Sequence, residues 1–129
     1  MKAITPPEIA PPFGAYSHGV AASVSRLLLT SGQLGIAPDG SVPADALGQA
    51  RQCFANIRAI LAEAEMDASD VLRLNAFVTD RAYFPAYMAA RDEWLAGVVV
   101  RPASTLVIVS GFTRPEFLVE VEATAGVLQ

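Results

Sequence analysis

Two stretches of this chain place apolar residues at the spacing of an amphipathic helix. Over residues 46–64, apolar side chains recur every three or four positions for about five turns. Asp45 stands directly before them as a candidate N-cap. A second such pattern follows Asp80 and runs to Leu95. Pro85 lies near its start, where a helix tolerates the missing N–H. The pattern therefore predicts two helices.

Five further segments have the alternating or β-rich composition of strands. They are residues 16–22, 26–31, 71–78, 105–110 and 117–126. The proline-rich residues 1–14 predict an extended leader. The order β-β-α-β-α-β-β predicts an α+β fold, in which one mixed sheet carries both helices on one face. We expect a single domain over residues 1–129.

The composition indicates that one face of this sheet is covered by another subunit. Hydrophobic residues make up 53% of the 129 residues and charged residues only 17%, whereas a globular domain is usually about 45–50% apolar. A membrane-spanning helix needs about 20 consecutive apolar residues, and the chain has no such run. The first residues also lack the apolar core of a signal peptide. The sequence therefore predicts a cytoplasmic oligomer with no membrane contact.

The charge and the rare residue types exclude several functional classes. The net charge is −4 and the nine basic residues form no cluster, which argues against nucleic-acid binding. Cys53 is the only cysteine and His18 the only histidine, so a disulfide, a catalytic triad or a zinc site is not expected. Residues 32–35 contain two glycines but lack the lysine and spacing of a phosphate loop. These residues therefore predict neither a zinc site nor a phosphate-binding loop.

Two pairs of side chains could carry acid–base chemistry. Tyr16 and His18 are two positions apart on a predicted strand and would share a face. They could line a pocket, or they could form an exposed pair at a sheet edge. Glu120 and Glu122 share a face in the same way. Paired carboxylates can separate their pKa values and serve as acid and base, but on an outer strand they also form a solvated surface.

Two arginines could bind an acidic ligand. Arg101 and Arg114 flank the predicted strand 105–110. A guanidinium binds a carboxylate through two parallel hydrogen bonds. Ordinary surface positions are the alternative for both residues.

Six motifs in order resemble the RidA/YjgF (L-PSP ribonuclease-like) family. They are GAYSHGV (14–20), LTSGQL (29–34), QARQ with a following Asn-Ile (49–57), FVTD (77–80), RPAST (101–105) and VEVEA (119–123). Each motif is short, but together they cover nearly the whole chain. The resemblance implies a chorismate-mutase-like α+β fold and a barrel-like homotrimer with pockets between subunits. It also implies hydrolysis of reactive enamines and imines, such as 2-aminoacrylate, to ketoacids and ammonia without a cofactor.

The resemblance assigns pocket roles to several residues. Tyr16, Ser31, Gly32 and Glu120 match family pocket positions, where a glutamate and a tyrosine orient the attacking water. The sequence therefore favours Glu120 as the group that takes a proton from water. His18 replaces a family glutamine and adds a second titratable candidate beside Tyr16.

The chain departs from the family pattern at two pocket positions. Ser104 stands where the family has the arginine that holds the substrate carboxylate, and Met88 stands where it has an asparagine. Because a serine cannot form a charged two-pronged contact, Arg101 or Arg114 would have to replace the lost arginine. The sequence predicts a deaminase acting on a metabolite other than the usual 2-iminoacids. The alternatives are a non-catalytic metabolite-binding, sensor or chaperone-like trimer and, less favoured by the acidic charge, an endoribonuclease.

Overall fold

A computed structural model describes residues 1–129 and contains two helices and two separate sheets. The helices are α1 (Ala46–Glu63) and α2 (Phe84–Trp94), with short 3₁₀ helices η1 (Ala68–Asp70) and η2 (Arg81–Tyr83). The main sheet comprises β3 (Val24–Leu29), β4 (Gln33–Leu34), β5 (Val71–Val78), β6 (Ala103–Ile108) and β7 (Val119–Leu128), and the small one β1 (Lys2–Ile4) and β2 (Gly19–Ala21). No helix combines the length and the apolar character that crossing a membrane would require.

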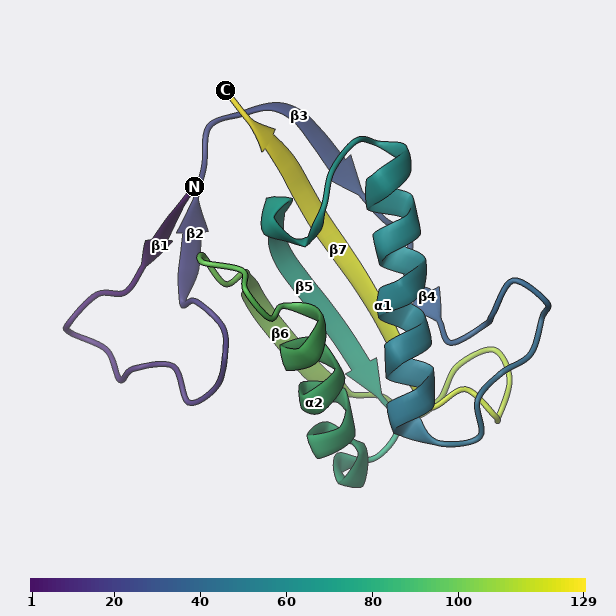
Figure 1. The fold of residues 1–129 in the computed structure, drawn as a ribbon. Coiled ribbons are helices and arrows are strands. Elements are labelled where there is room, and N and C mark those ends of the chain that lie inside the picture. The colour runs from purple at the N-terminus through teal and green to yellow at the C-terminus, as the bar shows by residue number, and fades with distance from the viewer.

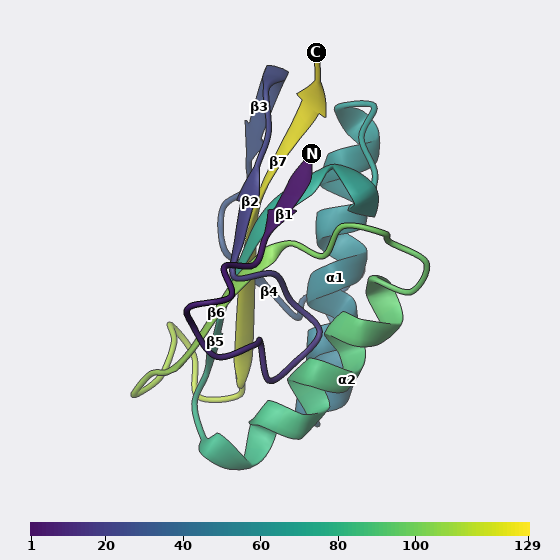
Figure 2. The same ribbon diagram turned by 90° about the vertical axis from the view of Figure 1, so that its left-hand side faces the viewer.

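The main sheet is mixed, as predicted. Its strands run in the order β3-β7-β5-β6, and β4 pairs with β7. Strands β5 and β6 are parallel and joined through α2, whereas the other pairs are antiparallel. Both helices lie on one side of this sheet (Figures 1 and 2). The predicted α+β architecture is therefore confirmed, and the trimeric assembly stays a prediction.

The two faces of β7 have opposite character because side chains alternate along a strand. Val119, Val121 and Ala123 are buried beneath the helices. Glu120 lies between them in sequence and so belongs to the other face, which carries no helix (Figure 2). On that uncovered face Leu29 of β3 is 70% exposed. Leu27, two positions earlier on the same face, is 57% exposed, and neighbouring apolar side chains exposed on a sheet face are typical of an interface.

Several predicted strand limits were wrong, because pairing partners decide where a strand ends. The predicted strand 105–110 is observed at Ala103–Ile108, where each residue pairs with β5. The predicted extended leader contains β1, which pairs with β2 outside the main sheet. This pairing limits the predicted strand 16–22 to Gly19–Ala21. Strand β4 has only two residues and was not predicted.

The helix ends follow local capping. The Asp45 carboxylate accepts a hydrogen bond from the Gly48 N–H at 3.0 Å and begins α1 as predicted. Glu65 follows the helix with a φ of 59°, the left-handed conformation that ends many helices. Asp80 caps η2 rather than α2. Helix α2 therefore starts one 3₁₀ turn later than predicted, with Pro85 in its first turn.

Candidate functional site

A cavity of about 200 Å³ lies where the loop before β2 meets α2 and β6, and we call it the helix-side pocket. Three residues predicted to form the site line it: Tyr16, Met88 and Ser104. The full lining is Phe13, Gly14, Tyr16, Phe84, Met88, Arg91, Ser104 and Leu106. Ser104 reaches this side of the sheet because it pairs with the buried Leu74 of β5.

Tyr16 is positioned by its own loop rather than by a strand, contrary to the prediction. Its N–H donates to the Gly14 carbonyl at 2.9 Å. Its ring stands edge-on to Phe13 at 5.7 Å and to His18 at 6.2 Å between centroids. The expected proximity of Tyr16 and His18 is therefore found, although neither residue is part of a strand.

His18 does not line the helix-side pocket. Its ring Nε2 lies 2.5 Å from the Ala10 carbonyl oxygen. A carbonyl only accepts, so Nε2 is the donor in this contact. His18 is consequently placed beside the pocket wall, where it packs against Tyr16.

The second group of predicted residues lies on the uncovered face of the sheet. Gly32 approaches Glu120 so closely that a Cβ atom there would be 2.7 Å from the carboxyl carbon. Ser31 is exposed next to it. Partial burial raises the pKa of the Glu120 carboxyl, and the negative charge of Glu122 raises it further. Glu120 therefore exchanges a proton at a higher pH than an ordinary glutamate does.

One chain does not bring all the predicted site residues together. Ser104 lies on the helix side of the sheet, whereas Glu120 pairs with Phe77 and lies on the uncovered face. Tyr16 and Met88 belong with Ser104, while Gly32 belongs with Glu120. The two half-sites could form one cavity only between two copies of the chain. Their union stays a prediction.

The two arginines proposed to replace the motif arginine do not line the helix-side pocket. Arg114 forms an ion pair with Glu116 at 3.1 Å, and its guanidinium carbon lies 4.4 Å from the centre of the Phe117 ring. The Arg101 carbonyl accepts a hydrogen bond from the Ser17 hydroxyl at 2.6 Å. One terminal nitrogen of Arg101 is buried without a partner.

A different arginine lines the pocket and was not predicted. Arg91 of α2 is only 4% exposed and is the one charged residue among those lining the cavity. It follows Met88 by three positions and so shares its helix face. That spacing was the available signal, because Met88 had already been matched to the pocket.

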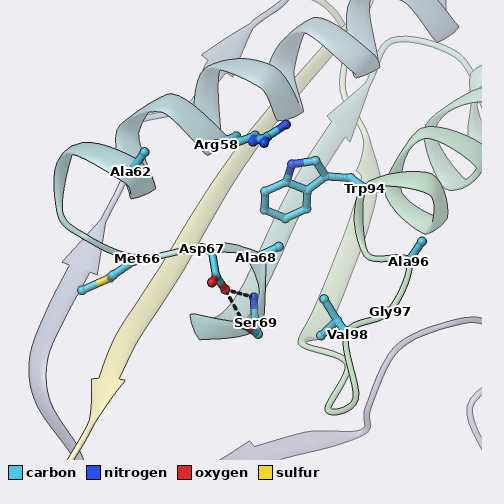
Figure 3. A pocket seen from close by; sticks show the side chains of 10 residues that line it. All are labelled: Arg58, Ala62, Met66, Asp67, Ala68, Ser69, Trp94, Ala96, Gly97 and Val98. Atoms are coloured by element: carbon cyan, nitrogen blue, oxygen red, sulfur yellow. Dashed lines mark hydrogen bonds between the residues drawn. The ribbon is translucent and has the colours of Figure 1, made fainter.

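The largest cavity, about 530 Å³, lies elsewhere and contains none of the predicted site residues. It lies between the end of α1, η1 and the segment after α2, with Arg58 and Trp94 reaching towards it from the two helices (Figure 3). The Asp67 carboxylate in its wall accepts hydrogen bonds from the N–H and hydroxyl of Ser69 (Figure 3). The Asp67 carboxylate therefore caps η1.

Groups suited to metal binding or thiol chemistry are scarce. No cluster of three or more His, Cys, Asp or Glu side chains could hold a metal ion. Cys53 is fully buried. Burial, together with the charge of Glu120, raises the pKa of the thiol to about 12. The thiolate form needed for nucleophilic attack is therefore rare near neutral pH.

Comparison with known proteins agrees with the resemblance of the motifs. A sequence model of the endoribonuclease L-PSP family matches residues 8–127. A RutC family protein of Haemophilus influenzae is 40% identical over 82 residues, 63% of this chain and 62% of that protein. The 2-iminobutanoate/2-iminopropanoate deaminase of Escherichia coli is 32% identical over 114 residues, 87% of each chain. The structure of YyfB from Yersinia pestis, a Rid family protein of unknown function, matches with a TM-score of 0.88 at 30% identity over 98% of both chains.

Proposed function

Because this chain belongs to the endoribonuclease L-PSP family, also called the RidA/YjgF family, we propose that it is a hydrolytic deaminase of small enamines or imines. The observation that carries this proposal is the Glu120 carboxyl, held against Gly32 with a raised pKa. A general base works best when its pKa lies near the operating pH. The name of the Escherichia coli relative, a deaminase of two iminoacids, supports the same reaction class.

The reaction needs only water and proton transfer. Water adds to the carbon of the C=N bond while the Glu120 carboxylate takes one of its protons. The protonated carboxyl then returns that proton to the nitrogen of the tetrahedral adduct. The carboxylate next takes the proton of the adduct's hydroxyl and passes it to the nitrogen as the C–N bond breaks, so that ammonia leaves and a C=O bond forms. An enamine enters the same route after it gains a proton on carbon and loses one from nitrogen, which converts it into the imine.

The working site on this proposal lies between subunits of a homotrimer. Two observations support the assembly: the uncovered sheet face exposes Leu29, and the two half-sites lie on opposite faces of one chain. Sedimentation at micromolar concentration tests it. Leu29→Glu should dissociate the trimer, whereas Val99→Glu should not, since Val99 lies in the segment after α2 and not on the uncovered sheet face. A wild-type monomer would refute the assembly.

The substrate differs from the usual 2-iminoacids because of the residue at position 104. Ser104 lies in the helix-side pocket and has no charge with which to hold a carboxylate. Losing a charged hydrogen bond costs about 1.5–3 kcal/mol, or roughly ten- to hundredfold in rate. We therefore expect poor turnover of 2-iminopropionate compared with relatives that keep the arginine. Equal turnover would contradict this assignment.

Ammonia release from a panel of enamines and imines tests the activity itself. Glu120→Gln should lower the rate by about a hundredfold or more, as expected for loss of a general base. Glu116→Gln is the matched control, because Glu116 forms an exposed pair with Arg114 away from the pocket. If ligands bind but no imine is hydrolysed, the protein is a non-catalytic binding trimer. Cleavage of RNA by the purified chain would instead favour the ribonuclease.

A further inference from the structure

We propose that Arg91 is the anion-binding residue of the helix-side pocket, and that its ligand carries a carboxylate held from helix α2 instead of strand β6. This assignment deepens the proposed function, since it concerns the substrate class of the same pocket. Arg91 lies outside the six motifs that carry the family resemblance.

The position of Arg91 follows from helical spacing. Phe84, Met88 and Arg91 are four and three residues apart and therefore lie on one face of α2. All three line the helix-side pocket. The remaining lining is apolar apart from the uncharged Tyr16 and Ser104. Arg91 thus supplies the only positive charge of the cavity.

The hydrogen bonding of Arg91 leaves its binding edge free. Its Nε donates to the Asp92 carboxylate at 3.1 Å. Neither terminal nitrogen donates to any protein atom, although the side chain is only 5% exposed. A Cβ atom built on Gly14 would lie 3.6 Å from Nη2, so this nitrogen lies beside the pocket wall. The two terminal nitrogens form an edge that can grip a carboxylate through parallel bonds.

The surroundings hold the guanidinium in place before any ligand arrives. Its carbon lies 5.9 Å from the centre of the buried Tyr87 ring. Asp92 fixes the Nε side from the next position on the helix. A group fixed on these two sides loses little freedom on binding, which favours affinity. Tyr16 and Ser104 line the same cavity, and each has a hydroxyl that can add a hydrogen bond to the bound acid.

A purely structural role explains this arrangement less well. Burying a guanidinium is costly unless its donors are satisfied. The ion pair with Asp92 satisfies one of the Arg91 donors. The Asp92 side chain is 48% exposed to solvent. Such exposed pairs add little stability. A carboxylate bound at the terminal edge would satisfy two of the four remaining N–H donors.

Moving the cation from β6 to α2 also changes which acids fit. In a 2-iminoacid the carboxylate is bonded directly to the imine carbon. When Arg91 on α2 binds the carboxylate, the imine carbon of a 2-iminoacid lies at a different place in the pocket. It is displaced from the position that it would take if an arginine at position 104 bound the carboxylate. The pocket therefore binds carboxylates while favouring a different spacing between the acid and the reacting carbon.

A binding experiment with the full chain tests the assignment without requiring turnover. The probes are pyruvate and its uncharged amide, pyruvamide, titrated by NMR into the wild type. Arg91→Gln should weaken pyruvate binding roughly ten- to hundredfold and leave pyruvamide binding unchanged. Arg91→Lys should recover part of the affinity. Arg114→Gln is the matched control, because Arg114 does not line the pocket.

The outcomes separate this inference from the proposed function. Absence of pyruvate binding to the wild type, or equal binding by Arg91→Gln, overturns the role of Arg91. If the variant does not fold, the guanidinium nitrogen signals of Arg91 in the wild type must shift when pyruvate is added, and unshifted signals overturn it. Arg91-dependent binding without ammonia release from any imine leaves the inference standing and rejects the deaminase. If uncharged imines are hydrolysed but Arg91→Gln does not change pyruvate binding, the deaminase stands and the role of Arg91 is rejected.

Discussion

Gln49 should be one of the most important single residues for stability, although it takes no part in the pocket. It is fully buried on α1. Its side-chain N–H group donates to the carbonyls of Pro43 at 2.9 Å and Glu116 at 2.8 Å. Its side-chain oxygen accepts from the N–H of Leu118 at 2.8 Å. One amide thus joins α1 to the segment before it and to the loop that enters β7.

Replacing Gln49 with Leu keeps the volume and leaves these three backbone groups without their partner. Each unpaired buried group costs about 1–3 kcal/mol, and these three hydrogen bonds are only partly buried. We therefore expect a loss of about 3–5 kcal/mol, a large part of the roughly 5–15 kcal/mol that stabilises a domain of this kind. Urea unfolding at fixed protein concentration measures the loss, because assembly makes stability depend on concentration.

The control is Gln52→Leu on the same helix. Gln52 donates to the Asn56 side chain one turn away, at 2.8 Å. Such pairs contribute only about 0.2–0.5 kcal/mol. If the two variants lose stability to within about 1 kcal/mol of each other, the three bonds of Gln49 do not have the importance that their geometry suggests.

Three further predictions concern the two half-sites. Gly32→Ala puts a methyl group 2.7 Å from the Glu120 carboxyl carbon. Imine turnover should fall with little change in melting temperature, because the flexible Glu120 side chain and not the backbone must move. The control Gly111→Ala, with open space around it, should change neither turnover nor melting temperature. Glu122→Gln removes a negative charge that raises the pKa of Glu120. Because the rate falls as the pH drops through that pKa, the acidic limb of the pH–rate profile should move to lower pH. An acidic limb that does not move contradicts the coupling between the two carboxyls. Ser104→Arg restores the motif arginine and should raise 2-iminopropionate turnover roughly ten- to hundredfold; an unchanged rate would show that position 104 is not what limits it.

The fold could be predicted where the pattern is local and repeated. Helix α1 and strand β5 match their predicted limits because each buries a regular stripe of apolar residues, with Ile57 and Leu74 at its centre. The short strands β1 and β4 depend on partners far along the chain. Lys2 faces Ala21, and Gln33 faces Val121. Nothing in two or three residues indicates such a partner.

The site was only partly predictable for a related reason. Tyr16, Met88 and Ser104 were identified through family motifs and do line one cavity. Arg101 and Arg114 were proposed as substitute cations because they flank the predicted strand 105–110, but neither lines the pocket. Arg91 lies 13 positions before Ser104 in sequence, and the two residues line the same cavity because α2 and β6 both border it. Sequence distance is therefore a poor guide to which arginine enters a pocket.

The division of the site between two faces links catalysis to assembly. The face that carries Glu120 is also the face that exposes Leu29. Covering that apolar face with a neighbour stabilises the assembly, and on the proposed trimer the same contact brings Glu120 to the helix-side pocket of the next subunit. A free subunit would hold the anion site at Arg91 without the base. Ligand binding should therefore survive dissociation better than hydrolysis does, and a Leu29→Glu variant that sediments as a monomer should still bind pyruvate weakly while releasing no ammonia from imines.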